Sequence, residues 1–122
     1  MNYLDYAATT PVNAEVLEVI TKEMASFGNP SSVYRIGREQ KQKIERVKKA
    51  ILSELQASPH DAIIFTSSGS EGNNLVFESI REHFAKEKGH IIVSAVEHPS
   101  VRKPAEFLEQ EGFDVTYLAP NK

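Results

Sequence analysis

The second half of the sequence alternates between strand-like and helix-like apolar patterns, and this alternation constrains the fold more than any other feature. The expected elements are strands over 62–66, 90–95 and 113–118 and helices over 71–86 and 101–111. The order strand, helix, strand, helix, strand is typical of an α/β layer with parallel strands. Parallel sheets are covered on both faces, which suits the continuous apolar run Ile91-Ile92-Val93.

Two helices are expected before this layer. Asn13 is placed to cap the first helix, and Gly28-Asn29-Pro30 is placed to end it. The second helix should follow Ser31-Ser32, and Pro59 lies beyond its end. The apolar positions predict a buried face on each helix. These faces are Leu17, Ile20, Met24 and Phe27 on the first helix and Ile36, Ile44, Val47, Ile51 and Leu55 on the second.

The composition is that of an ordinary globular chain and excludes several classes of site. Apolar residues make up 40% of the 122 residues and charged residues 25%, and 14 basic against 17 acidic residues give a net charge of −3. Because the chain has no Cys, it cannot form a disulfide, a thiolate zinc site or a thiol nucleophile. No apolar run approaches the roughly 18 residues of a membrane span, and the first residues do not resemble a signal peptide. We therefore expect a cytoplasmic protein with no membrane partner.

Basic residues are concentrated between Arg35 and Lys49, a segment with seven basic and two acidic residues. Such a segment could meet nucleic acid or an acidic partner. No nucleic-acid motif accompanies it, so a solvated helix face is the favoured interpretation and nucleic acid is not an expected partner.

The segment Phe65–Asn74 runs from a predicted strand through a Ser/Gly turn into a helix. Ser68 and Glu71 have capping-box spacing, and the first turn of such a helix offers unpaired N–H groups to a phosphate. Gly69 would let the backbone approach closely, and Ser68 or Ser70 would add a hydroxyl. A plain helix cap is the alternative. A serine nucleophile elbow, with His98 and Asp114 as partners, is a weaker one because their order along the chain is unusual.

His98 lies in the loop 95–100, at the carboxyl end of the second predicted strand. Ligands of open α/β sheets bind at that edge, so His98 could lie against a planar ligand or move a proton. A surface or capping histidine is the alternative. The other histidines, at positions 60, 83 and 90, have no metal-ligand spacing, and no metal site is expected.

Five blocks spread over the chain occur together in one known family. They are Tyr3-Leu4-Asp5-Tyr6-Ala7-Ala8-Thr9-Thr10-Pro11, Phe27-Gly28-Asn29-Pro30-Ser31-Ser32, Ile64-Phe65-Thr66-Ser67-Ser68-Gly69-Ser70-Glu71-Gly72-Asn73-Asn74, Ser94-Ala95-Val96-Glu97-His98 and Gly112-Phe113-Asp114-Val115-Thr116-Tyr117-Leu118. With them the chain resembles the N-terminal part of the cysteine desulfurases, fold-type I enzymes of the class V aminotransferase group that use pyridoxal 5′-phosphate (PLP). The resemblance implies one incomplete domain over 1–122, in which 1–30 is an N-terminal segment and helix and 31–122 begins the PLP-binding large domain.

The resemblance also implies roles for three residues. Gly69 and Ser70 match the pair that binds the PLP phosphate, and His98 matches the histidine that stacks on the pyridine ring and takes part in catalysis. Two positions depart from the family pattern: Tyr34 stands where histidine is common, and Gly72 where alanine or serine is usual.

Several family residues have no counterpart here. The lysine that binds PLP covalently lies in a Ser-x-His-Lys motif, and Ser58-Pro59-His60-Asp61 lacks it. The nucleophilic cysteine is missing too, and the family enzymes are about three times as long, which fits two domains. We therefore expect an inactive fragment of an enzyme that converts L-cysteine to L-alanine, transfers sulfur to an acceptor protein and forms a homodimer. A selenocysteine lyase, another class V aminotransferase or a non-catalytic interaction module are the alternatives.

Overall fold

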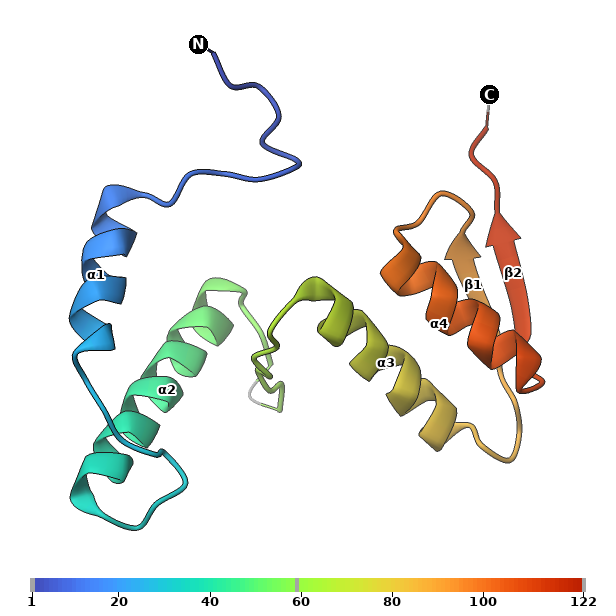
Figure 1. The fold of residues 1–122 in the computed structure, drawn as a ribbon. Helices are drawn as coiled ribbons and strands as arrows, with labels where there is room; N and C mark the ends of the chain where they lie inside the picture. The colour runs from blue at the N-terminus through green and yellow to red at the C-terminus, as the bar shows by residue number, and fades with distance from the viewer. Residues whose placement is uncertain (1, 59, 122) are drawn as a thin grey trace. The chain divides into compact units, whose positions relative to one another are not determined.

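The computed structural model describes residues 2–58 and 60–121. These residues divide into two compact units, one that ends at Ile63 and one that begins at Ile64. Pro59, expected beyond the end of the second helix, lies outside the described residues. The division does not test the single-domain interpretation, which stays a prediction. The elements, in the order shown in Figure 1, are α1 (Ala14–Met24), α2 (Arg35–Glu54), α3 (Gly69–His83), β1 (His90–Ser94), α4 (Pro99–Gln110) and β2 (Asp114–Leu118).

The first unit contains α1 and α2, and the segment 25–34 that joins them includes a turn in which the Ser32 N–H donates to the Asn29 carbonyl oxygen. Asn13 caps α1 as predicted, since its side-chain oxygen accepts a hydrogen bond of 2.8 Å from the Glu15 N–H. The turn after α1 packs against Gly37 of α2. A Cβ at Gly37 would lie 2.3 Å from the carbonyl oxygen of Asn29, so only glycine allows this close approach.

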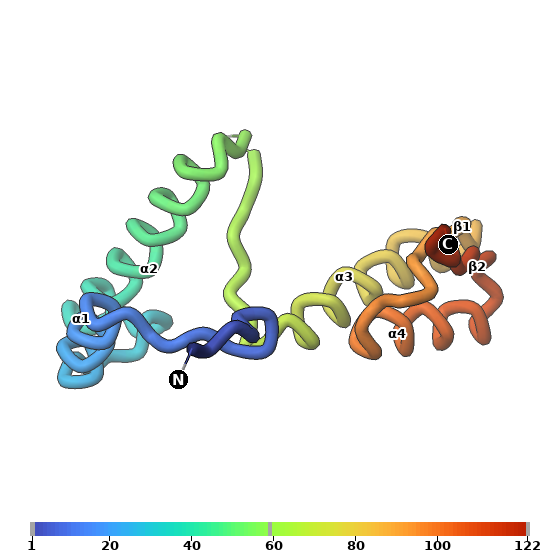
Figure 2. Tube along the Cα trace, turned by 90° about the horizontal axis from the view of Figure 1, so that it is seen from above, coloured from blue at the N-terminus to red at the C-terminus, as the bar shows by residue number. Residues whose placement is uncertain are grey.

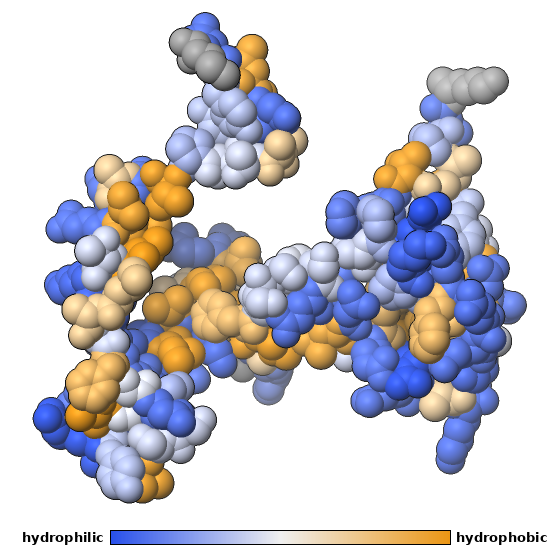
Figure 3. Space-filling view, in the orientation of Figure 1, coloured by the Kyte–Doolittle hydropathy of each residue, from blue (hydrophilic) through white to orange (hydrophobic). Residues whose placement is uncertain are grey.

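The predicted buried faces of α1 and α2 are largely exposed, and this expectation was wrong (Figure 3). α1 buries no residue, and Gly37 is the one fully buried residue of α2. Ile44 and Ile51 are half-buried. An apolar stripe becomes a core only where a second layer covers it. The exposed members of the two stripes are Leu17, Ile20, Met24, Phe27, Ile36, Val47 and Leu55.

The second unit is built on a parallel pair of strands, β1 and β2, joined by α4. Their register pairs Ile91 with Val115 and Val93 with Tyr117, and these side chains pack toward the helices. Figures 1 and 2 both show α3 and α4 side by side within this unit. The predicted α/β class with parallel strands is therefore confirmed. The buried core consists of Phe77, Val93, Ala105, Leu108 and Phe113.

Two predicted details of this unit were wrong. Residues 62–66 form no strand, because no strand of the described residues lies beside them to share a hydrogen-bonded ladder. The observed arrangement is therefore one βαβ unit in place of βαβαβ. The helical spacing of Val76, Ile80 and Phe84 in the sequence predicts that they share a buried face. On α3, however, the buried residue is Phe77, and Val76 is 58% exposed. Ile80 does pack against the core as predicted.

Within the part of the chain that the structure describes, no helix has both the length and the apolar character needed to cross a bilayer.

Replacing Leu108 by alanine tests the core of the second unit. Leu108 is 1% exposed, so Leu108→Ala should lower the free energy of unfolding of the 122-residue chain by about 2–5 kcal/mol through lost burial and a cavity. Phe107→Ala is the matched control, because Phe107 is its neighbour on α4 and is 50% exposed; its loss should stay below about 1 kcal/mol. Urea unfolding followed by circular dichroism measures both. Equal losses would contradict this description of the core.

Candidate functional site

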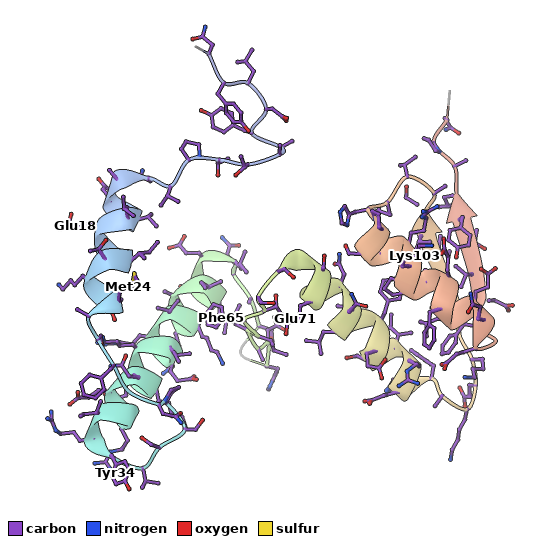
Figure 4. All side chains as sticks on the ribbon, in the orientation of Figure 1. Glu18, Met24, Tyr34, Phe65, Glu71 and Lys103 are labelled. Atoms are coloured by element: carbon purple, nitrogen blue, oxygen red, sulfur yellow. The ribbon has the colours of Figure 1, made fainter. Side chains whose placement is uncertain are left out.

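The start of α3 is fixed by a network of short hydrogen bonds. Ser68 is the N-cap, and its hydroxyl oxygen accepts a hydrogen bond of 3.2 Å from the Glu71 N–H, as the capping-box spacing predicts. The return bond differs from that motif: the Glu71 carboxylate accepts from the Ser67 N–H at 2.5 Å and from the Ser67 hydroxyl at 2.6 Å. Figure 4 shows Glu71 at this end of α3 and Phe65 in the segment that leads into it.

These bonds stabilise the charged form of Glu71. The Ser67 hydroxyl, and after it the Ser67 backbone N–H, lower the pKa of the Glu71 carboxyl below 4.5. A carboxylate in the first turn also interacts favourably with the positive end of the helix dipole. Because the Glu71 carboxylate accepts hydrogen bonds from Ser67, it does not accept one from the N–H of Gly69 or Ser70.

Gly69 and Ser70 provide three unused donors at this helix end. Neither backbone N–H, nor the Ser70 hydroxyl, donates a hydrogen bond to the described part of the chain. Both residues are exposed, and a Cβ at Gly69 would meet no atom within 4 Å. Two amides and a hydroxyl at the positive end of a 15-residue helix form a donor set that fits a phosphate group.

His98 lies in the loop after β1 and forms the N-cap of α4. Its imidazole is exposed, and Nδ1 lies 2.8 Å from the Ser100 hydroxyl oxygen. The same hydroxyl oxygen lies 2.9 Å from Nδ2 of Asn73 on α3, so a direct contact joins the two helices near their N-termini.

Ser70 and Asn73 are three residues apart and share one face of α3. The contact between Asn73 and Ser100 therefore brings the His98 loop to the face of α3 that carries Ser70. The structure places the three predicted site residues within one unit, at neighbouring helix N-termini. The sequence analysis did not single out Asn73 or Ser100 as site residues, because their contact spans 27 residues.

The structure rules out a serine nucleophile elbow with His98 and Asp114 as partners. Asp114 pairs with His90 at the first residues of the two parallel strands, whereas His98 follows the last residue of β1. A five-residue strand is about 13 Å long, so Asp114 and His98 lie at opposite ends of the parallel strands. His90 contacts Thr116 across the strands at 2.8 Å, and His83 packs edge-on against Phe84.

Known proteins resemble the chain over nearly its whole length. The family described as Aminotransferase class-V matches residues 2–122. Cysteine desulfurase IscS of Dictyoglomus turgidum is 44% identical over 95% of this chain and 29% of its own length, and human selenocysteine lyase is 39% identical over 98% and 31%. A solved structure described as SspA in complex with cysteine is 40% identical, with a TM-score of 0.87 over 99% of this chain and 35% of its own. The chain thus spans about a third of the length of these relatives.

Removing the Ser67 hydroxyl tests the electrostatics at the start of α3. In Ser67→Ala the pKa of Glu71 should rise toward 4.5, because the largest cause of its lowering is lost. A carboxyl with a lowered pKa stabilises the fold fully above its unfolded pKa and loses that contribution as pH falls through the folded one. A side-chain NMR titration of Glu71 in both chains measures the change. An unchanged Glu71 pKa in Ser67→Ala would contradict the assignment, and Glu71→Gln identifies the resonance.

Proposed function

Because the chain belongs to the class V aminotransferase family, we propose that it supplies the phosphate- and ring-binding part of a PLP-dependent cysteine desulfurase. The proposal rests on two observations. The donors of Gly69 and Ser70 have no acceptor among the residues that the structure describes. Asn73, on the same face of α3, contacts Ser100 in the segment that carries His98.

Each site residue has a distinct task in this proposal. The Gly69 and Ser70 amides and the Ser70 hydroxyl bind the cofactor phosphate, and the helix dipole favours its negative charge. His98 lies against the cofactor ring and holds or moves a proton at Nε2, because Nδ1 is occupied by Ser100. When bound, PLP supplies an electron sink for cleavage of bonds at the substrate's carbon atoms.

The proposed substrate of the complete enzyme is L-cysteine, which is converted to L-alanine while the sulfur passes to an enzyme cysteine and then to an acceptor protein. The 44% identical relative is a cysteine desulfurase, and cysteine is bound in the similar solved structure. We propose that the 122-residue chain is inactive alone, because it has no Cys and no Ser-x-His-Lys motif. Homodimer formation and a cytoplasmic location belong to the same proposal.

L-Selenocysteine is the alternative substrate, because human selenocysteine lyase is 39% identical over 98% of the chain. Sulfur and selenium substrates differ at the atom that leaves. In a chimera, residues 2–122 replace the matched segment of the Dictyoglomus turgidum enzyme, and the rest of that enzyme is unchanged. PLP binding by this chain can be measured in the chimera without deciding between the two substrates.

Two glycine substitutions in this chimera test phosphate binding. Gly69→Ala should weaken PLP binding tenfold or more, because a helical Cβ points toward the N-terminus and would enter the space where the phosphate approaches. The chain itself tolerates this Cβ, which meets no atom within 4 Å. Gly72→Ala is the matched control, since its Cβ would lie 3.6 Å from Thr66 Oγ1 and its N–H already donates to Ser68.

PLP titration followed by absorbance measures the dissociation constants, and thermal unfolding checks the fold of each variant. Equal PLP affinity of Gly69→Ala and Gly72→Ala would contradict the assignment of the phosphate to the start of α3.

His98→Ala in the same chimera separates a role in the reaction from a role in folding. His98 is exposed, so its removal should change the unfolding midpoint little, while L-alanine formation should fall by a hundredfold or so, the scale of a lost acid–base group. Alanine production and thermal unfolding are the two measurements. Equal proportional loss of stability and turnover would make His98 structural.

A further inference from the structure

Three polar side chains from two helices form a continuous chain of hydrogen bonds that ends on His98. Asn73 Nδ2 lies 2.9 Å from Ser100 Oγ, and Ser100 Oγ lies 2.8 Å from His98 Nδ1. The Ser100 backbone N–H donates to the same Nδ1 at 3.1 Å. Asn73 and Ser100 are both half-buried, whereas the imidazole is exposed.

The chemistry of these groups fixes the direction of each bond. The amide nitrogen of Asn73 is only a donor, so the Ser100 hydroxyl oxygen accepts from it. The hydroxyl hydrogen is then left for His98 Nδ1, which already accepts the Ser100 N–H. A nitrogen that accepts from two donors carries no hydrogen of its own. In the neutral ring, the hydrogen must therefore be on Nε2.

We propose that Asn73 and Ser100 are positioning residues that hold neutral His98 as the Nε2–H tautomer, with Nε2 directed away from α4 and free to meet a ligand. Two donors hold Nδ1, one of them the backbone N–H at the start of α4, so the ring plane is fixed together with the tautomer. Asn73 in turn ties this arrangement to the face of α3 that carries Ser70.

The consequence for chemistry rests on the proposed function, whereas the tautomer does not. If the chain binds PLP as proposed, Nε2 is the single ring nitrogen through which His98 exchanges a proton with a bound group. Because Nε2–H is the donor form, the neutral ring offers a hydrogen bond rather than a lone pair to that group.

Nitrogen NMR of the 122-residue chain, labelled with ¹⁵N in the histidine rings, tests the proposal without any cofactor. Spectra that correlate ring nitrogens with ring carbon-bound hydrogens distinguish a protonated from an unprotonated Nδ1. They are recorded at a pH where the imidazole is neutral. The expected result is an unprotonated Nδ1 and a protonated Nε2 for His98, with His98→Ala identifying the signals.

Variants of the two positioning residues make the test specific. Ser100→Ala removes the hydroxyl donor, and Asn73→Asp reverses the bond by drawing the Ser100 hydroxyl hydrogen toward a carboxylate. Each should change the tautomer ratio of His98 about fivefold, which corresponds to one ordinary hydrogen bond of about 1 kcal/mol. Ser100→Thr keeps the hydroxyl and should restore the original ratio. His90, which contacts Thr116 on the sheet, is the internal reference and should not respond.

A hydrogen on Nδ1 of His98 in the unchanged chain would overturn the proposal, as would one tautomer ratio shared by the original chain, Ser100→Ala and Asn73→Asp. Amide spectra establish that each variant is folded, and Ser100→Ala decides the matter if Asn73→Asp is not. Because no PLP is present, failure of this test is distinguishable from failure of the chimera to bind PLP.

Discussion

The packing of α4 against the β1–β2 pair and α3 is the contact on which the rest of the second unit depends. The buried residues of the described chain that form a hydrophobic core all lie between Phe77 and Phe113, and Ala105 and Leu108 of α4 are at its centre. Burying a leucine side chain contributes roughly 1.5–3 kcal/mol. The same packing brings the N-termini of α3 and α4 side by side, so the position of the candidate site is a consequence of the core.

Hydrogen bonds refine this arrangement without being able to create it. A single bond such as that between Asn73 and Ser100 contributes about 0.5–1.5 kcal/mol net, less than the burial of Leu108. The bond matters because it is directional: a hydrogen bond specifies which two atoms face each other, whereas an apolar contact does not. The core therefore decides that the two helix ends meet, and the polar chain from Asn73 to His98 decides how the imidazole is presented.

The first unit shows the opposite balance. α1 and α2 have clear apolar stripes, yet α1 buries none of its residues, and polar contacts such as the 2.6 Å pair between Lys43 and Glu23 join the segments. Such exposed ion pairs contribute little to stability. Gly37 of α2 is buried, in contrast to the apolar stripes, because its missing side chain lets the turn at Asn29 lie directly on α2. An apolar stripe thus indicates which side of a helix can be buried. That side is buried only where a second layer of helices or strands packs on it.

Local signals in the sequence were sufficient for the helix starts at Asn13 and Ser68, the parallel α/β class and the identities of Gly69, Ser70 and His98 as candidate site residues. Capping and periodicity depend on residues a few positions apart, so they can be read along the chain. The missing strand at 62–66, the burial of Phe77 in place of Val76 and the roles of Asn73 and Ser100 were decided by the tertiary structure. Each depends on what lies beside the residue in space. A strand needs a partner strand, and a side chain needs a facing layer. The Ser100 hydroxyl that contacts His98 also needs the Asn73 amide, which lies 27 residues away along the chain.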